Sequence, residues 1–357
     1  MDSRFTHWTA VGALFVAAAA LAVAIVAAVR AAADETGSSV PTASGMGHGA
    51  EGHGAPVSGD DVPAATEDSG GQVLQHTMVE GIRTYELVAR PVRWSILPGT
   101  RVVAYSYNGT VPGPEIRVPY GERIRVVVRN ELSDPTTVHW HGIAVPNDMD
   151  GVPGLTQEPI APGASFTYEF DAIPAGRGPS GGTFMYHSHF QEDRQVGLGL
   201  AGTLVIEDPR AVRYDVERTI VISEWAHDTA TGETRPPMEF DGSFPNFFTL
   251  NGKSYPATET IAVRRGDRVL LRLVGAGQFE HPMHLHGTNF RIVAKDGFPV
   301  REPLVADVVQ VAPGERYDIA FTATEPGSWI FHCHIGHHLT NDGEDPGGLI
   351  LVVDVSR

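Results

Sequence analysis

A duplicated pattern constrains the fold of this chain more than any other feature of its sequence. Three stretches within residues 120–189 recur at the same offset of 145 residues within residues 265–334. They are the segments YGERIRVVV and RGDRVLLRL, the motifs HWHG and HLHG, and the segments GTFMYHSH and GSWIFHCH. Several independent matches at one offset indicate a tandem duplication, so the chain should contain two copies of one domain.

Short alternating segments predict that both copies are all-β. From about residue 72 onward, stretches such as RIRVVVRNEL, SFTYEFDAI and RYDIAFTA alternate apolar and polar residues and are rich in β-branched side chains. The 40 glycines and 26 prolines of the chain supply turns, and its sequence contains no helix-length amphipathic stretch. We therefore expect two β-sandwich or β-barrel domains, at residues 72–210 and 211–357.

The first 71 residues differ from the rest of the chain. An apolar run of 20 residues from Ala10 to Val29 leads us to interpret residues 1–33 as a signal peptide or an uncleaved membrane anchor. Residues 34–71 are rich in Gly, Ser, Ala and acids, with scattered histidines, and should form a flexible linker. Both interpretations of the first segment predict an exported protein, either secreted or anchored on the outer face of the cell membrane.

Four His-X-His pairs predict metal sites. In an extended strand, residues i and i+2 point to the same face, so each pair presents two imidazoles side by side. One such pair is a weak signal, but four pairs repeated by the duplication carry too large a desolvation cost for an apolar core. Imidazole-rich sites suit copper, zinc, iron or nickel. The pairs are His139/His141, His187/His189, His284/His286 and His332/His334.

The single cysteine of the chain narrows the choice of metal. Cys333 stands between His332 and His334, so on a strand its thiol points to the opposite face and a second metal site should lie back to back with the first. A thiolate with two histidines is the ligand set of blue-copper electron-transfer sites. We expect His281 and a histidine just after the strand to complete this set.

The duplication also indicates where the thiolate site is absent. The expected ligand positions of the second copy correspond, 145 residues earlier, to Thr136, Ser188 and Asp193. None of these is a cysteine or a histidine, whereas the four paired histidines of the first copy are kept. The thiolate site should therefore occur in the second domain alone.

Together these motifs resemble those of the multicopper oxidases, most closely the two-domain, laccase-like members of the small laccase type. The resemblance rests on HWHG, MDGVPGLTQ, YHSH, HPMHLHG and HCHIGHH, and it covers roughly Tyr107 to Val353. It implies two tandem cupredoxin-like Greek-key β-barrels and four coppers per chain equivalent. It also implies a homotrimer, in which each three-copper cluster lies between domain 1 of one chain and domain 2 of the next.

The resemblance implies a role for each histidine of the motifs. His281, Cys333 and His338 would hold the type 1 copper that takes electrons from the substrate, which leaves His337 as a spare. His139 and His284 would hold the type 2 copper. Two further sets of three histidines would hold the two type 3 coppers. These sets are His141, His187 and His334, and His189, His286 and His332.

Two other residues carry expectations of their own. Asp150 matches the family position of a carboxylate that relays protons for oxygen reduction, and a simple turn residue before Gly151 is an equal alternative. Leu349 is the candidate for the axial position of the type 1 copper, where leucine cannot ligate. The loop LTNDGEDP before it carries three acids, which could favour cationic donors or simply be solvated.

The expected function is the one-electron oxidation of small-molecule donors, phenols or aromatic amines, coupled to the reduction of dioxygen to water. The alternatives are a cuprous or ferrous metallo-oxidase in copper tolerance, a copper nitrite reductase, and a non-enzymatic copper-binding envelope protein, which His48 and His53 of the linker favour. Nitrite reductase fits poorly, because that family keeps its type 1 cysteine in the first domain, where Ser188 stands. The net charge of −17 argues against nucleic acid as a partner.

Overall fold

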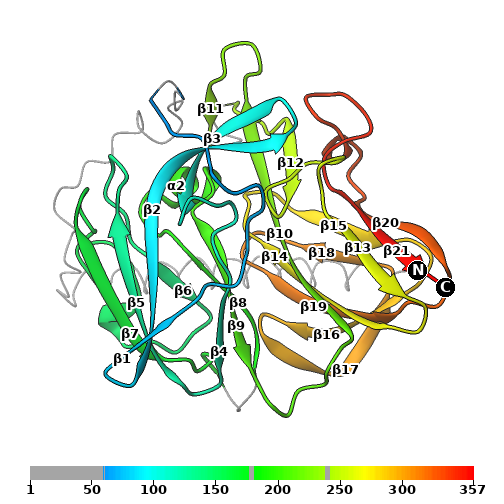
Figure 1. The fold of residues 1–357 in the computed structure, drawn as a ribbon, viewed down its shortest axis with the longest axis horizontal. Coiled ribbons are helices and arrows are strands. Elements are labelled where there is room, and N and C mark those ends of the chain that lie inside the picture. The colour runs from blue at the N-terminus through cyan, green and yellow to red at the C-terminus, as the bar shows by residue number, and fades with distance from the viewer. Residues whose placement is uncertain (1–58, 60, 177–180, 238–241) are drawn as a thin grey trace, which may run out of the picture. The chain divides into compact units, whose positions relative to one another are not determined.

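The computed structural model describes residues 59, 61–176, 181–237 and 242–357, and most of their regular structure is β (Figure 1). This confirms the all-β prediction. The named helices of this part are short: η1 (Asn147–Met149), α2 (Glu192–Gly197) and η2 (Gly336–Leu339). No helix within the described ranges is long and apolar enough to cross a membrane. The predicted signal or anchor at residues 1–33 and most of the linker, including His48 and His53, lie outside the described residues.

Two sheets form the first half of the fold. In β5, Ile124, Val126 and Val128 are buried while Arg125 and Val127 between them are only partly buried, so the period-2 pattern of the sequence turns one face of this strand into the core. The five-stranded sheet contains β1 (Thr77–Val79), β2 (Ile82–Leu97), β3 (Thr100–Tyr107), β5 (Arg123–Asn130) and β7 (Ser165–Asp171). The four-stranded sheet contains β4 (Ile116–Pro119), β6 (His139–His141), β8 (Gly182–His187) and β9 (Ala201–Glu207).

Two further sheets form the second half. The seven-stranded sheet contains β10 (Val216–His227), β11 (Thr234–Arg235), β12 (Phe247–Leu250), β14 (Arg268–Gly275), β16 (Phe290–Lys295), β17 (Phe298–Ala306) and β19 (Arg316–Thr322). The five-stranded sheet contains β13 (Thr260–Arg264), β15 (His281–Leu285), β18 (Val308–Val311), β20 (Gly327–Cys333) and β21 (Ile350–Ser356). A second apolar core, which includes Met283, Phe331 and Cys333, lies between these sheets.

The two halves share one topology. A long strand pairs in parallel with a later strand in each half, β2 with β5 and β10 with β14. A second parallel pair lies in the other sheet, β4 with β9 and β13 with β21. The strands that carry histidine pairs are antiparallel, β6 with β8 and β15 with β20. The duplication in the sequence is therefore a duplication of one Greek-key, cupredoxin-like domain, and Figure 1 shows the two copies side by side.

Both apolar and polar contacts fix the two halves against each other. Trp94 of the first half packs in one cluster with Trp225 of the second, and its indole N–H donates to the carbonyl of Gly252 at 2.7 Å. The Thr183 hydroxyl on β8 donates to the buried Asp318 carboxylate on β19 at 2.6 Å. The boundary predicted between residues 210 and 211 falls in the connection between β9 and β10, and it stays a prediction.

Candidate metal centres

Three buried side chains of the second half meet at one point. The Nδ1 atoms of His281 and His338 lie 3.1 Å apart, and the Cys333 Sγ lies 3.4 Å from the Nδ1 of His338 and 4.0 Å from that of His281. Cys333 is completely buried. Burial raises the pKa of its thiol to about 11, a shift that a bound cation would reverse by favouring the thiolate. One sulfur and two facing imidazole nitrogens form a set that could hold a metal ion.

The register of two strands creates this meeting. β15 and β20 are antiparallel, with Met283 opposite Cys333 and His284 opposite His332. Because side chains alternate along a strand, Cys333 and Met283 face the core of the domain, whereas the two histidines face the other side of the sheet. The thiolate set and the histidine pairs of this half therefore lie on opposite faces of one sheet. The backbone next to Cys333 joins them directly.

His338 lies almost completely buried beside this set. It belongs to η2 and stacks on Phe248, with ring centroids 4.2 Å apart. The residue is 2% exposed, and its Nδ1 is the nitrogen that faces Cys333 and His281. Burial lowers the pKa of His338 to about 3, so the ring stays neutral near neutral pH.

Leu349 borders the same site through its backbone. The Cys333 N–H donates to the Leu349 carbonyl at 3.1 Å, and the Leu349 N–H donates to the His338 carbonyl at 2.9 Å. The leucine side chain is fully buried in the core that contains Cys333. It offers no ligand atom, so this position excludes water from the site without binding a metal.

A carboxylate that the sequence analysis missed completes the surroundings of His281. Glu224 on β10 lies 1% exposed, and its Oε1 accepts a hydrogen bond from the His281 Nε2–H at 2.6 Å. The two residues are far apart in sequence, so no motif spacing could link them. The available signal was a lone acid within the apolar strand RTIVISEWAH, where a buried charge demands a partner.

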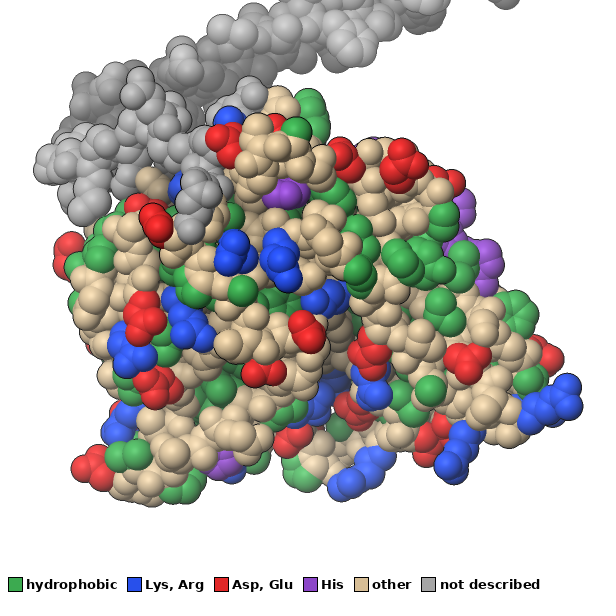
Figure 2. All heavy atoms as spheres, turned by 45° about the horizontal axis from the view of Figure 1, so that its top comes forward, with side chains coloured by type: hydrophobic (Ala, Val, Ile, Leu, Met, Phe, Trp, Pro, Cys, Tyr) green, Lys and Arg blue, Asp and Glu red, His purple; other side chains and the backbone are tan. Residues whose placement is uncertain are grey.

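The second half carries four more histidines on the outer face of its sheet. His286 and His332 approach to 3.1 Å between their Nε2 atoms, and the rings of His284 and His334 lie 5.6 Å apart. His286 and His334 are exposed. Figure 2 shows histidine side chains at the surface beside hydrophobic ones, at one edge of the face that it draws.

The first half repeats this arrangement. His139 on β6 lies opposite His187 on β8, the same register as His284 and His332 in the second half. The ring of His139 lies 5.7 Å from that of His141, 5.4 Å from that of His187 and 5.6 Å from that of His189. Burial is the main cause that lowers the pKa of His187 to about 3 and that of His141 to about 4, so both rings are neutral and able to ligate near neutral pH.

The polar atoms of both sets are arranged as metal ligands require. Four of the histidines direct Nδ1 at a backbone carbonyl oxygen, which only an N–H can satisfy, so their Nε2 lone pairs remain available. The Nδ1 of His141 is buried without a partner, and a metal ion would satisfy it. With the thiolate set behind one sheet, these donors fit copper. The carbonyl pairs are His139 with Asp150, His187 with Ser188, His284 with Asp307 and His332 with Cys333, at 2.8–2.9 Å.

The two histidine sets remain separate within one chain. In the described part of the structure, the rings of the first set contact one another, and so do those of the second, without a ring contact between the sets. The groups of metal-ligating atoms are likewise separate. Each set alone is half of the eight-histidine constellation that the sequence predicts.

The first half fills the position of the thiolate site with hydrogen bonds. The hydroxyls of Thr136 and Ser188 both donate to the Gln195 Oε1, at 2.8 and 2.6 Å, and all three side chains are fully buried. Asp193, which the 145-residue offset aligns with His338, is therefore not the structural counterpart. Gln195 takes that place because the chain after His189 folds into α2, where the second half has η2.

Two carboxylates lie beside the first histidine set. Asp150 approaches the Nδ1 of His139 both with its carbonyl oxygen and with its Oδ1, the latter at 3.3 Å. Glu192 on α2 lies 3.7 Å from the Nδ1 of His187 and 3.7 Å from the Nε2 of His189. Asp150 was predicted from the sequence, and Glu192 was not. Glu192 follows His189 by only three residues, and this closeness in the sequence was the available signal.

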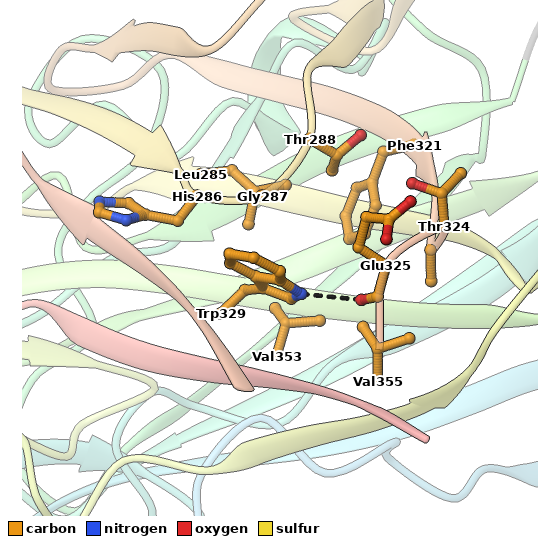
Figure 3. Close-up of a pocket in the computed structure, with 11 residues that line it drawn as sticks. Leu285, His286, Gly287, Thr288, Phe321, Thr324, Glu325, Trp329, Val353 and Val355 are labelled. Carbon is orange, nitrogen blue, oxygen red and sulfur yellow. Dashed lines mark hydrogen bonds between the residues drawn. The ribbon is translucent and has the colours of Figure 1, made fainter. Parts of the chain in front are cut away.

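A small pocket behind His286 supports the second set. Figure 3 shows the Trp329 indole against Gly287, with its Nε1–H donating to the Glu325 carbonyl at 2.9 Å. A Cβ on Gly287 would lie 2.4 Å from the indole, and φ there is +78°, so this position requires glycine. The packing fixes the backbone next to His286.

Comparisons with known proteins agree with this geometry. Two multicopper oxidase family models match residues 89–211 and 230–343. Laccase-1 of Botryotinia fuckeliana is 36% identical over 261 residues, which cover 67% of this chain and 44% of that protein. Multicopper oxidase MmcO of Mycobacterium tuberculosis is 31% identical over 271 residues, with 67% and 52% covered. The chain thus spans about half the length of these curated relatives. A blue copper oxidase crystal structure from Nitrosomonas europaea matches with a TM-score of 0.70 at 34% identity, covering 76% of this chain and 85% of that one.

Proposed function

Because the chain belongs to the multicopper oxidase family, we propose that it is a laccase-like oxidase that couples one-electron oxidation of phenols or aromatic amines to four-electron reduction of dioxygen to water. One observation carries the proposal: Cys333 faces a buried thiolate set while its neighbour His332 belongs to a histidine set on the other face of the sheet. A donor site and an oxygen site are thereby joined through a few covalent bonds. Copper, when bound, supplies the one-electron chemistry at both.

Each residue has a defined task in this proposal. Cys333, His281 and His338 hold the type 1 copper, and Leu349 keeps water away from it. The ring of His338, which retains a small exposed fraction, is the candidate contact point for the donor. Asp150 holds the ring of His139 and is the candidate carrier of protons to the oxygen site. The type 2 ligands are His139 and His284, and the type 3 ligands are His141, His187, His189, His286, His332 and His334.

The proposal includes a homotrimer whose three-copper clusters form between chains. Two observations support it. The histidine sets of one chain do not contact each other, and buried contacts hold its halves in place, so closure within the chain would require breaking them. Apolar side chains also lie exposed beside both sets: Leu155, 80% exposed, follows the Asp150 turn, and Val308 pairs with His284. Contact with a neighbouring chain would remove both side chains from water.

Export is part of the proposal as well. The apolar run within residues 1–33 supports a signal peptide or anchor, and the protein would then act outside the membrane, secreted or attached to it. Cell fractionation with N-terminal sequencing of the mature protein tests this. A chain retained in the cytoplasm with its first residues intact would refute it.

The experiment that tests the function is metal analysis followed by oxygen-uptake assays. The copper-loaded protein should bind four coppers per chain equivalent and consume oxygen with phenols and aromatic amines. Activity with Cu(I) or Fe(II) alone would replace the proposal with a metallo-oxidase. Reduction of nitrite would indicate a nitrite reductase, and copper binding without any turnover would indicate a storage protein.

A further inference from the structure

Glu224 has surroundings that are unusual for a carboxylate. It accepts N–H groups from three residues: the backbone of Gln278 at 3.0 Å, the backbone of Phe279 at 3.4 Å and the His281 ring at 2.6 Å. Its side chain is fully buried, and its ion-pair partner in the described structure is His281 rather than a lysine or arginine. A buried carboxylate without a cation costs free energy, which these aligned donors offset.

The neighbouring backbone is shaped to admit this carboxylate. A Cβ on Gly277 would lie 1.9 Å from the Glu224 Oε2, so only glycine leaves room for the side chain. The turn from Gly277 to Phe279 also aims two backbone N–H groups at the carboxylate and leads directly into His281. Strand β10, the turn and the first residue of β15 therefore form one unit around the His281 ring.

The hydrogen bond determines which nitrogen of His281 faces the thiolate set. A carboxylate oxygen can only accept, so the proton of the ring lies on Nε2 and the lone pair lies on Nδ1. That Nδ1 is the atom 3.1 Å from the Nδ1 of His338 and 4.0 Å from the Cys333 Sγ. A carboxylate partner also makes an imidazole a more electron-rich ligand than a neutral partner does.

We propose that Glu224 is a positioning residue that holds His281 as the Nε2–H tautomer and lowers the reduction potential of the type 1 copper. This inference rests on the proposed function. An electron-rich imidazole stabilises cupric over cuprous copper, so the carboxylate opposes the effect of an axial leucine, which favours a higher potential. Through this potential, Glu224 limits which donors the type 1 copper can oxidise, although its own side chain does not contact them.

The first test is a redox titration of the visible type 1 absorption. Glu224→Gln keeps an oxygen for His281 but removes the carboxylate, and the potential should shift to a more positive value. Gly277→Ala keeps the carboxylate but displaces it, and the shift should have the same sign. Glu217→Gln on the same strand, away from the thiolate set, is the control and should leave the potential unchanged. Unchanged potentials in both test variants would overturn the proposal.

The second test needs neither copper nor a variant. In metal-free protein labelled with ¹⁵N-histidine, His281 should give the Nε2–H tautomer, with its proton shifted by a strong hydrogen bond. The Nδ1–H tautomer would overturn the proposal even if the enzyme is an active oxidase. A protein that shows the expected tautomer but binds no copper would refute the oxidase proposal. Without a type 1 copper, the proposed effect of Glu224 on its reduction potential would be refuted as well.

Discussion

Among single residues, Cys333 alone lies in the thiolate set and adjoins two histidines of the second set, so its replacement is the sharpest test. Cys333→Ser should abolish the intense visible absorption and the oxidation of donors, because an alcohol cannot replace the covalent thiolate bond to copper. The fold should persist, since Ser188 occupies the equivalent buried position of the first domain. Absorption spectra and oxygen uptake measure the loss, and circular dichroism checks the fold.

A variant of the other site provides the matched control for Cys333→Ser. His187→Ala removes one imidazole from the first histidine set, on a different domain from the thiolate set. It should keep the visible absorption and lose oxygen consumption. If Cys333→Ser retains donor oxidation, or if His187→Ala loses its colour, the assignment of the two sites is wrong.

Sequence patterns revealed the candidate ligands themselves but not the residues that hold them. The His-X-His pairs and Cys333 were identifiable because strand alternation turns a two-residue spacing into a shared face. Glu224 was not, because the packing of two sheets in space, not spacing in sequence, brings a side chain of β10 to the start of β15. Gln195 was not predicted as the counterpart of His338 for a related reason. The offset of 145 residues holds within strands and fails in the loop where α2 replaces η2.

Among the elements, the turn that follows η1 packs closely against the start of β6. Gly151 has a φ of +82°, and a Cβ there would lie 2.0 Å from the Val138 carbonyl oxygen. Gly151→Ala should push this turn away from the strand and weaken the hydrogen bond from His139 to Asp150. We expect reduced copper occupancy at the proposed three-copper cluster with an intact type 1 absorption, measured by metal analysis and electron paramagnetic resonance.

Gly154 is a control within the same loop. Its φ of +72° imposes a similar backbone strain on alanine, but nothing lies within 4 Å of a Cβ there. Gly154→Ala should therefore lose some stability while keeping its copper. Equal copper loss in both variants would mean that strain of the loop, not contact with β6, is responsible.

The strands differ in how well the sequence predicts them. Strands with one buried face, such as β5 and β7, follow the alternating pattern closely. β17 lacks this pattern, because it is an edge strand with a largely exposed surface and it contains Pro299 and Pro303. An edge strand needs neither a buried face nor a complete set of N–H donors, so its sequence carries no clear β signal.

At the scale of the whole molecule, the buried histidines make the metal-free protein sensitive to acid. Burial lowers the pKa values of His187 and His338 to about 3, below the value near 6.5 in an unfolded chain. The unfolded state therefore binds more protons as pH falls below about 6.5. Each of these residues should reduce the free energy of unfolding by up to about 1.4 kcal/mol per pH unit in that window.

Urea unfolding of the metal-free protein between pH 7 and pH 4.5 measures this slope. His187→Gln supplies the control, since an amide cannot take up a proton, and its stability should fall less steeply with decreasing pH. A wild-type stability that stays constant across this range would show that the histidines are not buried as neutral rings in the folded chain.

The separation of the two histidine sets leads to a test of how the molecule assembles. His187→Ala damages the first set and His286→Ala the second, so each variant alone should lack oxygen consumption. Co-expressed, they should recover about a quarter of wild-type activity, because that share of interfaces would join the intact first domain of one chain to the intact second domain of another. Clusters built within single chains would remain damaged in every copy.

The control for this recovery is a pair of variants damaged in the same set. His141→Ala co-expressed with His187→Ala leaves no intact first set at any interface, so no activity should return. Size measurement must accompany both assays, because recovery requires mixed oligomers. A mixture of His187→Ala and His286→Ala that forms oligomers without recovering activity would contradict the inter-chain cluster, as would a wild-type monomer that consumes oxygen. Two results together require that neighbouring chains share one oxygen site. Activity must return when His187→Ala is mixed with His286→Ala, and it must stay absent when His187→Ala is mixed with His141→Ala.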